Sequence, residues 1–193
     1  MTTGEAKIKA ALITLLKQTT FEHVTVTAIV TQADINRGTF YQHYTDKYDL
    51  LNQLEMQFEQ ALAAIFARYF DETMTPNHLE PYPVVQQAVQ LVANNFALLQ
   101  ALLGPNGDPR LEYRLKQRTK SAVQHQLTNR KGAPKLTPQL PAEFAWNLEI
   151  DGIFDVFKVW LSQSKPVTPT ELSQILMQTR YLSPYKMLGL TTD

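Results

Sequence analysis

The feature that most constrains the fold of this chain is a pair of short helical patterns that only four residues, ADIN, separate. Thr25 can cap the first pattern at its N-terminus, and Ile29 and Val30 then lie on one apolar face. The second pattern begins after Asn36, another good N-cap, and we expect it to run to about Tyr44. Helices this short are not stable alone. The pattern therefore predicts two helices that pack on each other as a helix-turn-helix.

Amphipathic stripes predict that the rest of the chain is helical as well. One stripe covers residues 5–18, and a longer one follows the cap residue Asp46 for about 22–25 residues. Further stripes lie at 83–103 (one helix or two abutting ones), at 110–128, at 142–163, and after Thr168 or Thr170. The proline-rich stretches 73–83 and 130–141 predict loops, and GPNGDP at 104–109 predicts a turn. No alternating pattern is long enough to indicate a strand, so the predicted fold class is all-α.

The composition excludes several kinds of site. The 193 residues include no cysteine, so no disulfide framework, thiolate nucleophile or cysteine-bound metal is expected. They are 44% hydrophobic, which suffices for a normal core, but no apolar run approaches the roughly 18 residues of a membrane span. The 18 lysine and arginine residues balance 18 aspartate and glutamate residues, so attraction to nucleic acid must come from local placement. We expect a soluble cytoplasmic protein without a membrane partner.

The segment DINRGTFYQHYTDKY at 34–48 concentrates aromatic rings beside basic residues. Ile35 and Phe40 are expected to face inward, and Tyr44 is expected to hold the second short helix to its neighbours. The other side chains of this helix then face outward, as in a recognition helix that enters a DNA major groove. Arg37 lies in its first turn, where a guanidinium can bridge guanine O6 and N7 and add about 1–3 kcal/mol of discrimination.

The candidate DNA contacts differ in what they would touch. Gly38 lets the backbone approach a base or a phosphate, and Thr39 can contact a thymine methyl group or a phosphate. Tyr41 and Lys47 suit phosphates, as do the threonines at the N-terminus of the first short helix. The predicted DNA-binding residues are Thr25, Thr27, Asn36, Arg37, Gly38, Thr39, Tyr41, Gln42, His43 and Lys47.

The stretch VTVTAIVTQADINRGTFYQHYTDKYDLL closely resembles the N-terminal DNA-binding signature of the TetR/AcrR family of transcriptional regulators. The resemblance spans about residues 5–55 and includes the Thr25 cap, Ile29 and the run GTFYQHYTDKYDLL. His43 matches a family position near the DNA. Asp34 stands where the family usually has glycine, which affects the turn because aspartate enters the left-handed backbone region at some cost.

This resemblance implies a DNA-binding domain at 1–47 and an effector-binding and dimerisation domain at 48–193. The segment LLGPNGDPRLEYRLK is similar to a C-terminal subtype common in the branch that includes the dihydroxyacetone-operon activator. The family's last two long helices form a homodimer interface, which the ring-rich helix at 142–163 favours independently. The predicted dimerisation residues are Phe144, Leu148, Phe157, Trp160, Leu172, Ile175 and Leu176. The implied function is a repressor that a small-molecule effector releases from near-palindromic double-stranded operator DNA.

Two other classes of function remain open. A helical enzyme could use Glu149, Asp151 and Asp155, but no nucleophile or base stands nearby in the sequence, so solvated or interface charges are preferred. The four histidines have no helical ligand spacing, and we expect no metal, cofactor or catalytic residue. The C-terminal domain could instead bind a protein partner. A closed apolar pocket would favour an effector, and an exposed groove would favour a partner.

Overall fold

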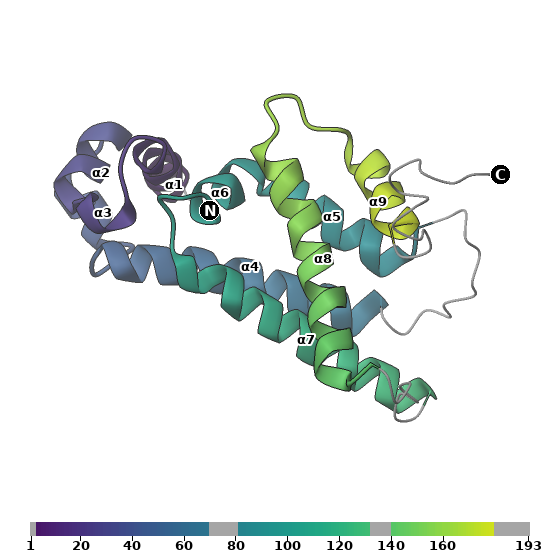
Figure 1. Cartoon of the computed structure of the whole chain (residues 1–193). Helices are drawn as coiled ribbons and strands as arrows, with labels where there is room; N and C mark the ends of the chain where they lie inside the picture. The colour runs from purple at the N-terminus through teal and green to yellow at the C-terminus, as the bar shows by residue number, and fades with distance from the viewer. Residues whose placement is uncertain (1–2, 70–80, 132–139, 180–193) are drawn as a thin grey trace. The chain divides into compact units, whose positions relative to one another are not determined.

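The computed structural model describes residues 3–69, 81–131 and 140–179, and every regular element in these ranges is a helix (Figure 1). The all-α prediction is therefore confirmed. The elements are α1 (Thr3–Leu16), the 3-10 helix η1 (Phe21–His23), α2 (Val26–Ala33), α3 (Arg37–Tyr41), α4 (Lys47–Tyr69), α5 (Pro83–Asn94), α6 (Phe96–Leu102), α7 (Pro109–Lys131), α8 (Ala142–Ser162) and α9 (Pro169–Gln178). In the described part of the chain, no helix combines the length and apolarity that a bilayer crossing requires. The predicted loops at 73–83 and 130–141 lie largely outside the described residues.

The chain divides into two compact units, each of which contains two separate segments of the sequence. Unit 1 consists of Met1–Ala61 and Asn95–Arg118, and unit 2 consists of Leu62–Asn94 and Thr119–Asp193. Both α4 and α7 contribute residues to each unit. The functional boundary between residues 47 and 48 stays a prediction.

The local structure of α2 and α3 follows from their cap residues. The Thr25 side chain accepts a hydrogen bond from the Ala28 amide at 3.1 Å, which satisfies one of the orphan donors of the first turn. Asn36 does the same for α3, where its Oδ1 accepts from the Thr39 amide at 2.7 Å. Asp34 has φ 50 and ψ 57, so the expected left-handed residue lies where α2 ends. Both predicted caps and this turn are confirmed.

α3 is shorter than the sequence pattern indicated. Its α-helical part ends at Tyr41, and the next residues form a turn in which the His43 and Tyr44 amides both donate to the Phe40 carbonyl. Phe40 and Tyr44 are buried, as predicted, whereas Ile35 is only half-buried. The rings of Phe40 and Tyr44 lie 5.7 Å apart, and α3 contacts both α1 and α2. Burial of such large side chains stabilises a packed unit by roughly 1.5–3 kcal/mol each.

The α4 cap and the 104–109 turn were also predicted correctly. Asp46 Oδ1 accepts from the Tyr48 and Asp49 amides at 2.8 Å each, and α4 has 23 residues. The stretch 83–103 forms two helices, because the backbone at Asn95 leaves the helical region with φ −116 and ψ 21. Within unit 1, α6 packs beside α1 (Figure 1).

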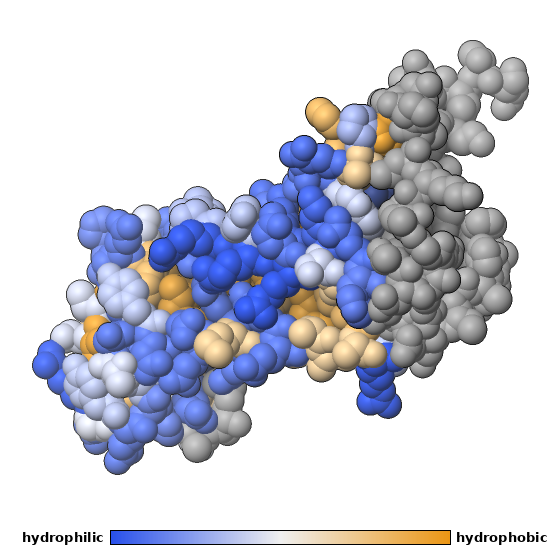
Figure 2. All heavy atoms as spheres, turned by 90° about the horizontal axis from the view of Figure 1, so that it is seen from below, coloured by the Kyte–Doolittle hydropathy of each residue, from blue (hydrophilic) through white to orange (hydrophobic). Residues whose placement is uncertain are grey.

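Unit 2 is held together by contacts of α9 with α5 and with α8. α9 begins with a complete capping box, in which the Thr168 hydroxyl accepts from the Glu171 amide and the Glu171 carboxylate accepts from the Thr168 amide. Trp160 lies in the core, and its Nε1 donates to the Val167 carbonyl at 2.8 Å, which fixes the connection from α8 to α9. In the view of Figure 2, the coloured residues form a mostly hydrophilic surface that several apolar patches interrupt.

Candidate nucleic-acid interface

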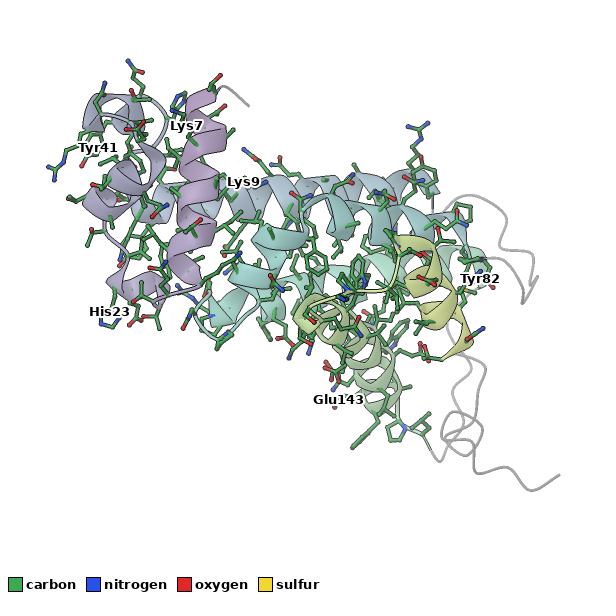
Figure 3. All side chains as sticks on the ribbon, turned by 90° about the horizontal axis from the view of Figure 1, so that it is seen from above. Lys7, Lys9, His23, Tyr41, Tyr82 and Glu143 are labelled. Atoms are coloured by element: carbon green, nitrogen blue, oxygen red, sulfur yellow. The ribbon has the colours of Figure 1, made fainter. Side chains whose placement is uncertain are left out.

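α3 presents a polar face on the side opposite its buried Phe40. Tyr41 is 54% exposed and lies at the surface of unit 1 (Figure 3). Its ring meets the edge of the Phe40 ring at a centroid distance of 5.5 Å, so the core sets the direction of this exposed phenol. The other predicted contacts on α3 and its flanks are exposed at Asn36, Arg37, Gly38 and Gln42 and half-buried at Thr39 and His43.

Arg37 is exposed in the first turn of α3, and a residue of α2 orients it. Its Nη2 donates to the Thr27 hydroxyl at 2.7 Å. A guanidinium carries five N–H donors, so this bond leaves capacity for a bidentate contact with a base. A side chain already held in one direction loses less conformational freedom when it binds. Thr27, predicted to contact phosphate, is thus also a positioning residue for Arg37.

Two other predicted DNA contacts serve the fold as helix caps. The Thr25 oxygen accepts from the α2 backbone, and Asn36 Oδ1 accepts from both the amide and the hydroxyl of Thr39. A hydroxyl and a side-chain amide keep donors for a phosphate while their oxygens accept these bonds. A Cβ at Gly38 would lie 3.1 Å from Asn36 Oδ1, so the small residue protects the cap.

His43 and Thr39 face α1. The His43 Nδ1 lies 4.0 Å from a Glu5 carboxylate oxygen, and a Cβ placed on Gly4 would lie 3.3 Å from both the His43 ring and the Thr39 methyl group. α1 therefore covers part of these two side chains, and a DNA contact would reach only their remaining surface.

Lys47 contacts the protein backbone. Its Nζ donates to the carbonyls of Phe21, Glu22 and Val24 at 3.1, 2.6 and 2.8 Å. It also lies 5.1 Å from the ring centroids of Phe21 and Tyr48. An ammonium group has three donors, so these carbonyls occupy all of them in this structure. The predicted phosphate contact of Lys47 stays a prediction, and it would require these bonds to be exchanged.

The predicted dimerisation residues fall into two groups. Phe144 and Leu148 on α8 are 63% and 70% exposed, and Ile175 on α9 is 37% exposed. Trp160, Leu172 and Leu176 are buried within unit 2, and Phe157 is half-buried, so these four pack behind the surface rather than forming it. Val159, which was not predicted, is 60% exposed. At 100° per residue, positions 144, 148 and 159 lie on one stripe of α8.

The carboxylates of α8 form no catalytic constellation in the described structure. Glu149, Asp151 and Asp155 are all exposed on the helix surface. Among the described residues, no group of three or more histidine, aspartate or glutamate side chains is placed to hold a metal ion. His78 lies outside the described residues.

Two capped short helices, with a polar exposed face on the second, define a helix-turn-helix DNA-binding protein with an additional helical domain. Comparisons with known proteins agree. Residues 8–54 match the family described as "Bacterial regulatory proteins, tetR family", and residues 79–180 match its "Transcriptional regulator C-terminal region". The second match covers more than half of the chain. The chain belongs to the TetR family of bacterial transcriptional regulators. Members of this family are not enzymes.

Individual relatives are distant. Over 59 residues the chain is 32% identical to the uncharacterized HTH-type transcriptional regulator YxbF of Bacillus subtilis (strain 168), a match that covers 31% of this chain and only 16% of that protein. A TetR transcriptional regulator from Streptococcus agalactiae 2603V has a TM-score of 0.55 at 20% identity, over 91% of this chain and 92% of that chain. The fatty acid degradation regulator FadR from Bacillus halodurans has a TM-score of 0.61 at 14% identity, over 91% and 93%. These two structures share the fold.

Sequence reasoning missed the backbone contacts of Lys47 and the exposure of Val159. The signal for Lys47 was weak, because its carbonyl partners lie 23–26 residues earlier in the chain. The exposure of Val159 could not be predicted because apolar residues surround most of α8, so periodicity alone did not show which side of the helix packs inward.

Proposed function

We propose that this TetR-family regulator binds a near-palindromic operator as a homodimer, with one α3 helix of each subunit in successive major grooves. The centres of these grooves lie about 34–36 Å apart in B-DNA. The observation that carries the proposal is the exposed first turn of α3, where Thr27 holds Arg37 toward the outside. In this proposal Arg37 contacts a base edge, while Thr25, Thr27, Tyr41 and Gln42 contact phosphates or neighbouring bases.

The dimer interface in this proposal is the exposed apolar stripe of α8 together with Ile175 of α9. Three large apolar side chains on one stripe, each at least 60% exposed, are a costly surface for a soluble monomer. A C2 dimer would bury the same stripe on both subunits. The buried Trp160 and Leu172 would support this face from within the chain.

We further propose that the protein is a repressor whose C-terminal domain binds a small-molecule effector. Family membership supports this role, and α4 offers a route for it because residues of α4 belong to both compact units. An effector can shift the protein toward a form that does not bind the operator only as far as its affinity for the two forms differs. The second candidate is a regulator whose C-terminal domain binds a protein partner instead of a small molecule. We also propose that the C-terminal domain belongs to the subtype that includes the dihydroxyacetone-operon activator.

The test of the proposed function is the selection of bound fragments from a pool of random duplex DNA. The proposal expects an enriched near-palindrome with half-sites one helical turn apart or a multiple of it. Because operator DNA lies in the bacterial cytoplasm, the proposal also places the protein there. A pool that stays random after repeated rounds at low salt would contradict the proposal.

A further inference from the structure

The turn between α6 and α7 contacts the segment that connects α1 to α2, although the two lie far apart in the sequence. The Phe21 amide donates to the Asn106 carbonyl at 2.9 Å, and Asn106 Nδ2 donates to the Leu16 carbonyl at 3.0 Å. Leu16 is the last residue of α1, and the final carbonyls of a helix have no partner inside it. Asn106 therefore caps α1 from another part of unit 1.

The turn itself is packed tightly. A Cβ on Gly107 would lie 1.9 Å from the Leu102 carbonyl oxygen, and one on Gly104 would lie 2.7 Å from the Gln100 carbonyl oxygen. The backbone of the turn thus packs directly on the end of α6, where only glycine fits. The Gly107 amide also donates to the Gly104 carbonyl at 3.1 Å. This close packing links the end of α6 to the segment that carries Asn106.

The other end of this turn is fixed to α4 by buried charges. Asp108 accepts a bond at 3.4 Å from Arg114, which also bonds Glu55 and lies 3.4 Å from a Glu59 carboxylate oxygen. The second Glu59 oxygen lies 2.7 Å from Arg118. The three carboxylates are at most 9% exposed, so each one that is ionised depends on these arginines for compensation.

These contacts form a closed ring within unit 1. α4 begins at Lys47, whose Nζ binds the Phe21, Glu22 and Val24 carbonyls. The same connector binds Asn106, and the turn returns to α4 through the ion pairs of Arg114. The N-cap of α2 follows Val24 directly. The ring therefore fixes the beginning of the helix-turn-helix to α4 from two sides.

We propose that Asn106 is a positioning residue for operator binding, which holds the α1–α2 connector in the place where both α3 helices of a dimer fit one duplex. This inference rests on the proposed function, since it concerns how the DNA-binding helices are placed. Asn106 does not contact DNA in this proposal. It acts through α1 and η1. Loss of its side-chain bond to Leu16 would loosen the connector, which would then be held only by the Asn106 carbonyl and by Lys47.

The test compares Asn106→Asp with Asn52→Asp. The first change keeps the side-chain shape and the backbone carbonyl but removes the amide donor to Leu16. The second makes the same charge change at an exposed position of α4 in the same unit. Affinity is measured for the selected operator and for a duplex with a single half-site. The salt dependence of binding, thermal unfolding and hydrogen exchange at the Phe21 amide are measured alongside. Asn106→Ala, which introduces no charge, is the second variant.

The inference expects both Asn106 variants to bind the full operator about 3- to 10-fold more weakly, the equivalent of one net hydrogen bond. It expects wild-type affinity for the single half-site, an unchanged salt slope and faster exchange at the Phe21 amide. Equal losses of affinity for the full operator and for the single half-site would indicate a local folding defect and would overturn the inference. Full-operator affinities of the Asn106 variants equal to that of Asn52→Asp would also overturn it. A wild type that selects no operator would overturn the proposed function and this inference together.

Discussion

Glu55 should make the free energy of unfolding depend on pH near neutrality. Its side chain in α4 is 5% exposed, and one carboxylate oxygen is buried without a hydrogen-bond partner while the other is bound to Arg114. Burial raises the pKa of Glu55 to about 7, with smaller upward contributions from Asp108 and Glu59 and a downward one from Arg114. The ordinary pKa of a glutamate side chain, which applies to the unfolded chain, is 4.5.

The sign follows from which state binds more protons. Between pH 4.5 and about pH 7 the folded protein holds a proton on Glu55 that the unfolded chain has lost, so the free energy of unfolding falls as the pH rises. The stabilisation is complete below the unfolded pKa and is lost as the pH rises through the folded one. A pKa difference of this size corresponds to about 3 kcal/mol over the whole window, and to about 2.5 kcal/mol between pH 5 and pH 8.

Urea unfolding of the wild type and of Glu55→Gln across this range measures the effect. The amide cannot ionise, so the stability of the variant relative to the wild type should increase by about 2.5 kcal/mol from pH 5 to pH 8. Glu22→Gln, at an exposed position of the same unit, is the control and should give a nearly constant difference. A Glu55→Gln difference that does not change with pH would show that the pKa of Glu55 is not raised in the folded protein.

Three further changes test separate parts of the structure. Lys47→Met should lower the free energy of unfolding by about 1–3 kcal/mol in urea titrations, because three carbonyls lose their charged donor. The salt slope of DNA binding tests the predicted phosphate contact separately: a slope about one unit smaller in the variant would support it, and an unchanged slope would exclude it. Leu148→Glu should convert the proposed dimer to a monomer in sedimentation equilibrium, and a persistent dimer would exclude the α8 stripe as the interface. Gly107→Ala should lower the unfolding free energy by about 2 kcal/mol or more, since its Cβ would overlap the Leu102 carbonyl; an unchanged melting temperature would count against a tight turn.

Local chemistry explains what the sequence could predict. Thr25, Asn36 and Asp46 lie at helix starts because their side chains bond amides only two or three residues away. Phe40 and Tyr44 are four residues apart, and the helical period alone indicated their shared burial. Such features need no knowledge of how distant segments meet.

Contacts between distant segments could not be predicted in this way. Arg114 meets Glu55 across 59 residues, and Asn106 meets Leu16 across 90. The helical pattern of the residues also did not show that α3 ends at Tyr41, short of the predicted Tyr44. The exposed side of α8 could not be predicted either, because apolar residues of this helix lie both in the core and on its outer face.

The contact between Arg37 and a base pair is the central claim, and base discrimination by Arg37→Ala tests it most directly. Affinity is measured for the selected operator and for operators with one base pair changed at each half-site position, with Lys7→Ala, an exposed cation of α1, as the control. We expect the wild type to discriminate at one position of each half-site by about 1–3 kcal/mol. Lys7→Ala should keep this preference, and Arg37→Ala should lose it at that position alone. If Arg37→Ala weakens binding to every duplex by the same factor, the Arg37 side chain does not contact a base edge, and α3 does not read the operator through it.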